Sequence, residues 1–226
     1  MAQTAETTEA RLDALRVLIV DDHDLFRTGL RNLLEEQGVH VIGEAAAGTE
    51  AIRAVRELAP DVVVMDLNMP GMTGVEATRH ITGIAPLTRV LVLTISDQDS
   101  DVLDAILAGA CGYLLKDSSI QELMAGIRAA AVGESLISPH IASKVLQRVR
   151  STSSVPAIAE AIRAELSDRE IEVLKLIANG KDNAMIAGEL HISPKTVKNH
   201  ISNILMKLQI DNRIQAAVYA VKSGIV

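Results

Sequence analysis

Five polar side chains stand at positions where short apolar runs of the sequence end. The runs VLIV, VVVM, VLVL and YLL are followed, in this order, by Asp21 and Asp22, Asp66, Thr94 and Lys116. Any one of them alone would be an ordinary polar loop residue. A whole set at successive strand ends is hard to explain as residues that are polar only because they face solvent. Clustered carboxylates repel one another unless a cation joins them, and hard oxygen ligands of this kind suit Mg²⁺. A lysine and a threonine opposite would receive the oxygens of a phosphoryl group.

Asp66 is the candidate nucleophile of such a site. A carboxylate that attacks phosphorus forms an acyl phosphate, as in aspartyl-phosphate enzymes. The charge that develops on the phosphoryl oxygens would be neutralised by Mg²⁺ bound beside Asp66. Asn68 lies two residues later, before Pro70 and Gly71, and its backbone carbonyl could be another metal ligand where the chain turns.

Strands must bring these side chains to one rim. The four apolar runs, at 17–20, 62–65, 90–93 and 113–115, are rich in β-branched residues, which is typical of strands buried on both faces. A more polar strand at 40–45 is expected at an edge of the sheet. Ligands of an open α/β sheet bind beyond the carboxyl ends of the strands, so the polar side chains would converge there.

Helical patterns separate the strands. One helix face is formed by the apolar residues Phe26, Leu30, Leu33 and Leu34. Gly38 then ends that helix, while Thr73 and Glu76 form a capping box that opens a later one. Five strands alternating with five helices predict an α/β fold over residues 16–135, a doubly wound parallel sheet with helices on both faces.

Four motifs of this region resemble the receiver domain of two-component response regulators. They are DD at 21–22, MDLNMPGMTG at 65–74, LT at 93–94 and GYLLKD at 112–117. The resemblance implies a five-stranded sheet in the flavodoxin-like order 2-1-3-4-5, and phosphorylation of Asp66 by a sensor histidine kinase. It also implies that Mg²⁺ is held by Asp22, Asp66 and the Asn68 carbonyl, with Asp21 acting through water.

Thr94 and Tyr113 match the switch pair of the receiver family. The resemblance implies that phosphorylation draws the Thr94 hydroxyl to the phosphoryl oxygen and turns the Tyr113 ring inward, while Lys116 pairs with the phosphoryl group. From its spacing alone, Tyr113 would be a residue that only packs in the core at the end of a strand.

Composition limits the other possibilities. The chain of 226 residues has 22 Lys and Arg against 29 Asp and Glu, and the resulting charge of −7 excludes a uniformly basic nucleic-acid coat. A single Cys excludes an internal disulfide framework and favours a reducing compartment. No apolar run approaches the ~20 residues of a membrane span. Because residues 1–15 are polar and acidic, we expect a disordered tail rather than a secretory signal, and a cytoplasmic protein without membrane contact.

The tail of the chain predicts a small all-α domain. Residues 165–226 hold eight basic and seven acidic residues, whereas the remainder has a net charge of −8. Ser167 and Glu170 form a capping box, and Ser193 with Pro194 is a strong start signal for a second helix. That helix has an apolar face and a polar face, the latter with Lys195, Lys198, Asn199, Ser202 and Asn203. Such a helix suits the major groove of DNA, although an exposed helix in a regulatory bundle could look similar.

Two stretches, ELSDREIEVLKLIANG and LHISPKTVKNHISNILMKL, resemble the LuxR-type helix-turn-helix at the end of NarL/FixJ-type regulators. The resemblance covers residues 164–226 and implies binding to double-stranded DNA. Lys198, Asn199 and Ser202 would then face base edges. Residues near the DNA backbone, or supporting the helix, would be Lys195, Thr196, His200 and Lys207. The last helix would form a dimer on DNA, pack within its own domain, or do both.

The chain is thus identified as a phosphorylation-activated transcriptional regulator. Residues 136–163 are expected to be a linker with a helical segment. The expected protein is not an enzyme beyond phosphorylation and slow dephosphorylation of its own Asp66, and it would form a homodimer when phosphorylated. One alternative is a regulator that acts without phosphorylation, against which the intact Asp, Thr and Lys set argues. Another is an aspartyl-phosphate phosphatase, which would need a second acid where Asn68 stands.

Overall fold

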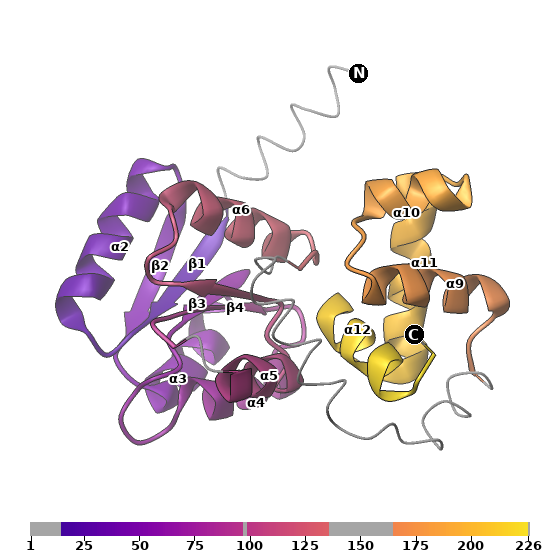
Figure 1. Ribbon diagram of the computed structural model, residues 1–226. Helices are drawn as coiled ribbons and strands as arrows, with labels where there is room; N and C mark the ends of the chain where they lie inside the picture. The colour runs from indigo at the N-terminus through magenta and orange to yellow at the C-terminus, as the bar shows by residue number, and fades with distance from the viewer. Residues whose placement is uncertain (1–14, 97–98, 136–164, 226) are drawn as a thin grey trace. The chain divides into compact units, whose positions relative to one another are not determined.

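The computed structural model describes residues 15–96, 99–135 and 165–225, which belong to two compact units (Figure 1). We call them the N-terminal unit (15–135) and the C-terminal unit (165–225) and describe each by itself. The expected linker at 136–163 and the expected tail, apart from Leu15, lie outside the described residues.

A five-stranded parallel sheet forms the centre of the N-terminal unit. Its strands are β1 (Arg16–Val20), β2 (His40–Ala45), β3 (Val62–Met65), β4 (Arg89–Thr94) and β5 (Gly112–Leu115). Their order is β2-β1-β3-β4-β5, which confirms the predicted order, with the more polar strand at an edge. All four residues of β3 are buried, as expected for a strand covered on both faces.

Helices cover both faces of this sheet (Figure 1). They are α2 (Asp24–Glu36), α3 (Gly48–Leu58), α4 (Gly74–Ile84), α5 (Asp99–Leu107) and α6 (Ile120–Ala131). One core cluster joins α2 and α6 to the sheet through Leu34 and Ile127, and the other joins α3 and α4 to the opposite face through Val55 and Ile81. The predicted doubly wound α/β fold is therefore confirmed.

The predicted helix signals are mostly confirmed in α2 and α4. Gly38 has a φ of +81° just beyond α2, and Thr73 makes both hydrogen bonds of the capping box with Glu76. Leu30 and Leu34 are buried, but Leu33 is 48% exposed. Because successive helical residues are about 100° apart, Leu33 lies at the rim of the face that Leu30 and Leu34 share.

The C-terminal unit consists of four described helices, α9 (Asp168–Ala178), α10 (Asn183–Leu190), α11 (Pro194–Leu208) and α12 (Arg213–Lys222). Each begins at a side chain that accepts a backbone N–H of its first turn; these capping residues are Ser167, Asp182, Ser193 and Asn212. His191 takes a left-handed conformation at the end of α10, where the chain turns toward α11. Each of the four helices contributes buried apolar residues, so a small aliphatic core holds this unit together.

Gly74 couples the start of α4 to the loop that carries Asp66. A Cβ atom on Gly74 would lie 2.0 Å from the carbonyl oxygen of Asp66. We therefore expect Gly74→Ala to lower the free energy of unfolding by about 1–3 kcal/mol, the usual cost of overpacking. Urea unfolding followed by circular dichroism measures this change.

Gly83, in the same helix, provides the matched control. A Cβ atom on Gly83 would meet nothing within 4 Å. Since alanine favours helices, Gly83→Ala should leave the free energy of unfolding unchanged or raise it by up to about 1 kcal/mol. Equal losses in the two variants would contradict the close approach of Gly74 to Asp66.

Candidate functional site

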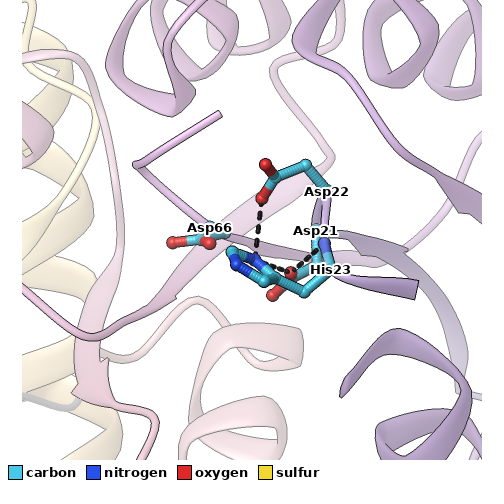
Figure 2. A group of neighbouring side chains, drawn as sticks. All are labelled: Asp21, Asp22, His23 and Asp66. Atoms are coloured by element: carbon cyan, nitrogen blue, oxygen red, sulfur yellow. Dashed lines mark hydrogen bonds and ion pairs between the residues drawn. The ribbon is translucent and has the colours of Figure 1, made fainter. Parts of the chain in front are cut away.

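The loops after β1 and β3 bring a group of acidic side chains together. Asp21, Asp22, His23 and Asp66 each offer a ligand atom, and these atoms lie within 4.8 Å of one another (Figure 2). The sheet causes this convergence, because Val20 of β1 is paired in register with Met65 of β3 and the next residue of each strand is an aspartate. Asp21 and Asp66 are each only 2% exposed, so their charges are largely removed from water.

Lys116 supplies the positive charge for this acidic group. Its Nζ lies 2.6 Å from Oδ2 of Asp21 and 2.7 Å from Oδ2 of Asp66. Lys116 follows β5, and its backbone N–H donates to the Thr94 carbonyl at the end of β4, which places it at the same rim. Burial alone would lower the pKa of Lys116, but the hydrogen bonds to the two carboxylates outweigh burial and raise that pKa above its ordinary value.

Arg27 fixes the loop at Asp21 by a hydrogen bond to its backbone, a role that the sequence analysis missed. Its guanidinium donates to the Asp21 carbonyl at 2.7 Å and to Oε2 of Glu44 at 3.0 Å. It also pairs with Asp24, in the first turn of α2. The loop is thus tied both to β2 and to α2, although spacing in the sequence offers no signal for the contact with Glu44.

His23 is a further member of the site that the sequence analysis did not select. Figure 2 shows its ring joined to the carboxylates of Asp22 and Asp21, with Nδ1 at 2.9 Å from Oδ1 of Asp22 and 3.4 Å from Oδ1 of Asp21. Its backbone N–H also donates to Oδ1 of Asp21. Its position directly after the two aspartates was a signal that could have found it.

The donor set fits a hard divalent cation. Of the three carboxylates in this group, Lys116 pairs with two, which leaves excess negative charge, and carboxylate oxygens are the ligands that Mg²⁺ prefers. Among the described residues, Oδ1 of Asp22 is buried and accepts no hydrogen bond, although Nδ1 of His23 lies 2.9 Å away. Asn68 is exposed, and its N–H donates to Oδ1 of Asp66 at 3.3 Å. The role of its carbonyl as a ligand stays a prediction.

The predicted switch residues meet at one loop. Thr94 is fully buried at the end of β4, and its hydroxyl accepts the Ser96 N–H at 3.4 Å. The ring of Tyr113 is fully buried in β5, and its hydroxyl donates to the Ser96 carbonyl at 2.8 Å. The ring therefore points into the fold, and Ser96, which the sequence analysis missed, contacts both members of the pair.

The face of α11 predicted to meet DNA is mostly open. Exposed side chains on it are those of Lys195, Lys198, Asn199, Ser202 and Asn203. Thr196 and His200 are half-buried, and the Thr196 hydroxyl lies 2.8 Å from the hydroxyl of the capping residue Ser193. That contact favours a role of Thr196 in the start of the helix.

Lys207, an exposed lysine of α11, forms an ion pair with a buried acid of α9. Its Nζ lies 2.7 Å from Oε2 of Glu170, which is 4% exposed and belongs to α9. Burial alone would raise the pKa of Glu170, but hydrogen bonds from Lys207 and Ser167 outweigh burial and lower that pKa. Of the two roles predicted for Lys207, this ion pair favours support of the helix over contact with DNA.

Two protein families match the two units. Residues 17–128 match the response regulator receiver domain, and residues 164–220 match the luxR family of bacterial regulatory proteins. The chain is 46% identical to the transcriptional regulatory protein LiaR of Bacillus subtilis over 213 residues, which cover 94% of this chain and 99% of LiaR. The chain thus belongs to the family of DNA-binding two-component response regulators that join a receiver to a LuxR-type helix-turn-helix.

Solved structures agree with this assignment. The response regulator ChrA of a heme-sensing two-component system is 35% identical to this chain, with a TM-score of 0.52 over 95% of this chain and 100% of ChrA. RcsB, solved as two dimers bound to two parallel DNAs, is 26% identical, with a TM-score of 0.54 over 93% of this chain and 98% of RcsB.

The family resolves part of the functional question. It is a family of transcriptional regulators and not of enzymes, which does not support the phosphatase alternative. Receiver domains bind Mg²⁺ in an acidic pocket, and this chain has a cluster of acidic side chains at Asp21, Asp22 and Asp66. None of the described helices has both the length and the apolar composition that crossing a bilayer requires.

The Glu170–Lys207 ion pair predicts a pH-dependent stability. Because the pKa of Glu170 is lowered in the fold, the pair stabilises the C-terminal unit above pH ~4.5 and stops doing so as the pH falls through the folded pKa. Lys207→Met should therefore lower the free energy of unfolding by about 0.5–1.5 kcal/mol at pH 7, because water screens the partly exposed lysine and weakens its bond to Glu170. Urea unfolding from pH 7 to pH 3 measures the difference from the wild type, which should shrink below pH ~4.5.

Lys175, an exposed lysine of α9, gives the control. Lys175→Met should change the free energy of unfolding by less than about 0.5 kcal/mol at every pH. A cost of Lys207→Met that stays constant down to pH 3 would contradict the stabilising role of the charge on Glu170.

Proposed function

We propose that this chain accepts a phosphoryl group on Asp66 from a sensor histidine kinase, and that this transfer controls DNA binding by α11. The receiver domain would span residues 16–135 and the DNA-binding domain residues 164–226. The observation that carries the proposal is the environment of Asp66, which is 2% exposed and paired at 2.7 Å with Lys116. A buried carboxylate beside a lysine and two further acids has the parts that phosphoryl transfer needs.

The transfer follows from these positions. A carboxylate oxygen of Asp66 forms a bond to phosphorus while the bond from phosphorus to the donor breaks, and the leaving group keeps the electron pair. Mg²⁺ would neutralise the charge on the transferred oxygens. The residues that would hold it are Asp22, Asp66 and, by its carbonyl, Asn68, with Asp21 acting through water. Lys116 already lies at hydrogen-bond distance from Asp66, so its ammonium needs only a short movement to reach a phosphoryl oxygen.

The switch would act through Ser96. The Thr94 hydroxyl would turn to the phosphoryl oxygen and leave the Ser96 N–H, which it accepts at 3.4 Å. The Tyr113 hydroxyl donates to the Ser96 carbonyl. Thr94 and Tyr113 would therefore shift the loop at Ser96 between a resting and a phosphorylated conformation. Phosphorylation would then favour a homodimer, unmask the helix-turn-helix, or do both.

The DNA contacts would come from the open face of α11. Lys198, Asn199 and Ser202 would face base edges, because lysine and asparagine side chains can bond to guanine and adenine in the major groove. Lys195 and His200 would lie near phosphates, and Thr196 and Lys207 would support the helix through Ser193 and Glu170. The solved complex of RcsB dimers with DNA supports DNA as the partner and a dimer as the binding form.

Phosphorylation is tested by mass spectrometry of the intact protein. Acetyl phosphate with Mg²⁺ should add one phosphoryl group to the wild type, and Asp66→Asn should abolish the addition because the amide oxygen is a poor nucleophile. Asp104→Asn, at an exposed acid of α5, should take up the group as the wild type does. A wild type that takes up none would favour the regulator that acts without phosphorylation, and an unchanged stoichiometry in Asp66→Asn would refute the site.

DNA binding separates base contacts from phosphate contacts. Lys198→Ala should weaken binding to the specific site by about 1–3 kcal/mol and relax specificity, as expected for loss of a base contact. Lys195→Ala should weaken all sequences alike and reduce the salt slope by about one, as expected for loss of a phosphate contact. Titrations at several salt concentrations, on specific and random DNA, measure both. An equal loss on both DNAs for Lys198→Ala would remove Lys198 from the base-reading set.

A further inference from the structure

The ammonium group of Lys116 has a third neighbour besides its two carboxylates. Nζ of Lys116 lies over the ring of Phe26, 4.5 Å from the ring centroid. A cation at this distance from an aromatic face is attracted by the negative charge of the π system. The two carboxylate bonds and the ring thus surround the ammonium, and the Lys116 side chain is only 10% exposed.

Phe26 occupies a particular place in the fold. It lies in the first turn of α2, partly buried against the core cluster that α2 and α6 form with the sheet. A groove of about 280 Å³ opens beside it, and Phe26 and Lys116 line this groove together with Leu25, Leu33, Leu93 and Leu123, among others. The ring therefore lies beside the ammonium, and both residues line the same groove.

We propose that Phe26 is a positioning residue for phosphoryl transfer, which acts by holding the Lys116 ammonium toward Asp66. This inference rests on the proposed phosphorylation of Asp66. During transfer the ammonium must exchange the carboxylate oxygen of Asp66 for a phosphoryl oxygen. The ring face is not consumed in that exchange, so it keeps the lysine directed at the site and limits its hydration. An electrostatic contact that excludes water is stronger than one exposed to it.

Phe26→Leu removes the aromatic face and keeps an apolar side chain of similar bulk. With acetyl phosphate and Mg²⁺, we expect this variant to be phosphorylated about 3–10-fold more slowly than the wild type, which corresponds to about 0.7–1.4 kcal/mol of barrier. Phe26→Tyr restores a ring and should restore the rate. Leu33→Ala changes the same groove, at a residue 48% exposed, and should leave the rate unchanged.

A spectroscopic signature tests the contact itself, without phosphorylation. The ε-methylene protons of Lys116 next to the Phe26 ring should show an upfield ring-current shift in the NMR spectrum. The shift should disappear in Phe26→Leu and persist in Phe26→Tyr and Leu33→Ala.

The outcomes separate this inference from the proposed function. If the wild type and Phe26→Leu are phosphorylated at the same rate, or if the ring-current shift is missing from the wild type, Phe26 has no positioning role and the phosphorylation of Asp66 stands. If the wild type takes up no phosphoryl group, the proposed function fails and this inference fails with it. The inference is supported if Phe26→Leu is phosphorylated more slowly than the wild type while Phe26→Tyr and Leu33→Ala are phosphorylated at the wild-type rate.

Discussion

Asp21 and Asp66 share one ammonium group at the centre of the N-terminal unit. The negative charges of two almost fully buried carboxylates repel each other, and the Lys116 ammonium offsets part of that repulsion at distances of 2.6 and 2.7 Å. These three residues come from the ends of β1, β3 and β5. The ion pair therefore forms only when the strands stand in their observed order, so the chemistry of the site depends on the topology of the sheet.

Because the site depends on the placement of Asp21 and Asp66, the backbone of the two loops that carry them is closely constrained. Gly74 must lack a side chain because α4 begins against the carbonyl of Asp66, and Arg27 fixes the other loop by its bond to the Asp21 carbonyl. One loop is thus held by the start of a helix and the other by a guanidinium. Fixed backbone on both loops keeps the Asp21 and Asp66 carboxylates in place, which is the benefit of preorganised charge.

Local patterns predicted the parts of the structure that depend on nearby residues. Short apolar runs rich in β-branched residues predicted the strands. Pairs of residues three apart in the sequence predicted the capping boxes at Thr73 and Ser167. The same S-x-x-E pattern at Ser119 was available and was missed. The convergence of Asp21, Asp66 and Lys116 could also be predicted, because parallel strands end at one rim.

Contacts between distant segments could not be predicted in this way. The ion pair of Lys207 with Glu170 joins residues 37 apart, and the bond of Arg27 to Glu44 joins two elements through side chains whose directions depend on packing. Nothing in the spacing of Phe26 or Ser96 points to their partners, Lys116 and Tyr113. Assigning roles to Lys207 and Thr196 from the helix face alone was ambiguous for the same reason, since a polar side chain there can also bond to a residue of its own domain.

The buried position of Tyr113 has a practical consequence for optical work. The chain holds two tyrosines and no tryptophan, with Tyr113 in the N-terminal unit and Tyr219 in the C-terminal unit. No indole group is present to dominate the ultraviolet emission, so each unit carries one intrinsic phenol fluorophore. Because the hydroxyl of Tyr113 is bonded to a backbone carbonyl in the loop beside Thr94, its emission reports on that loop in the unlabelled protein. Replacing Tyr219 with phenylalanine would leave a single-probe chain whose fluorophore lies beside Ser96 and Thr94.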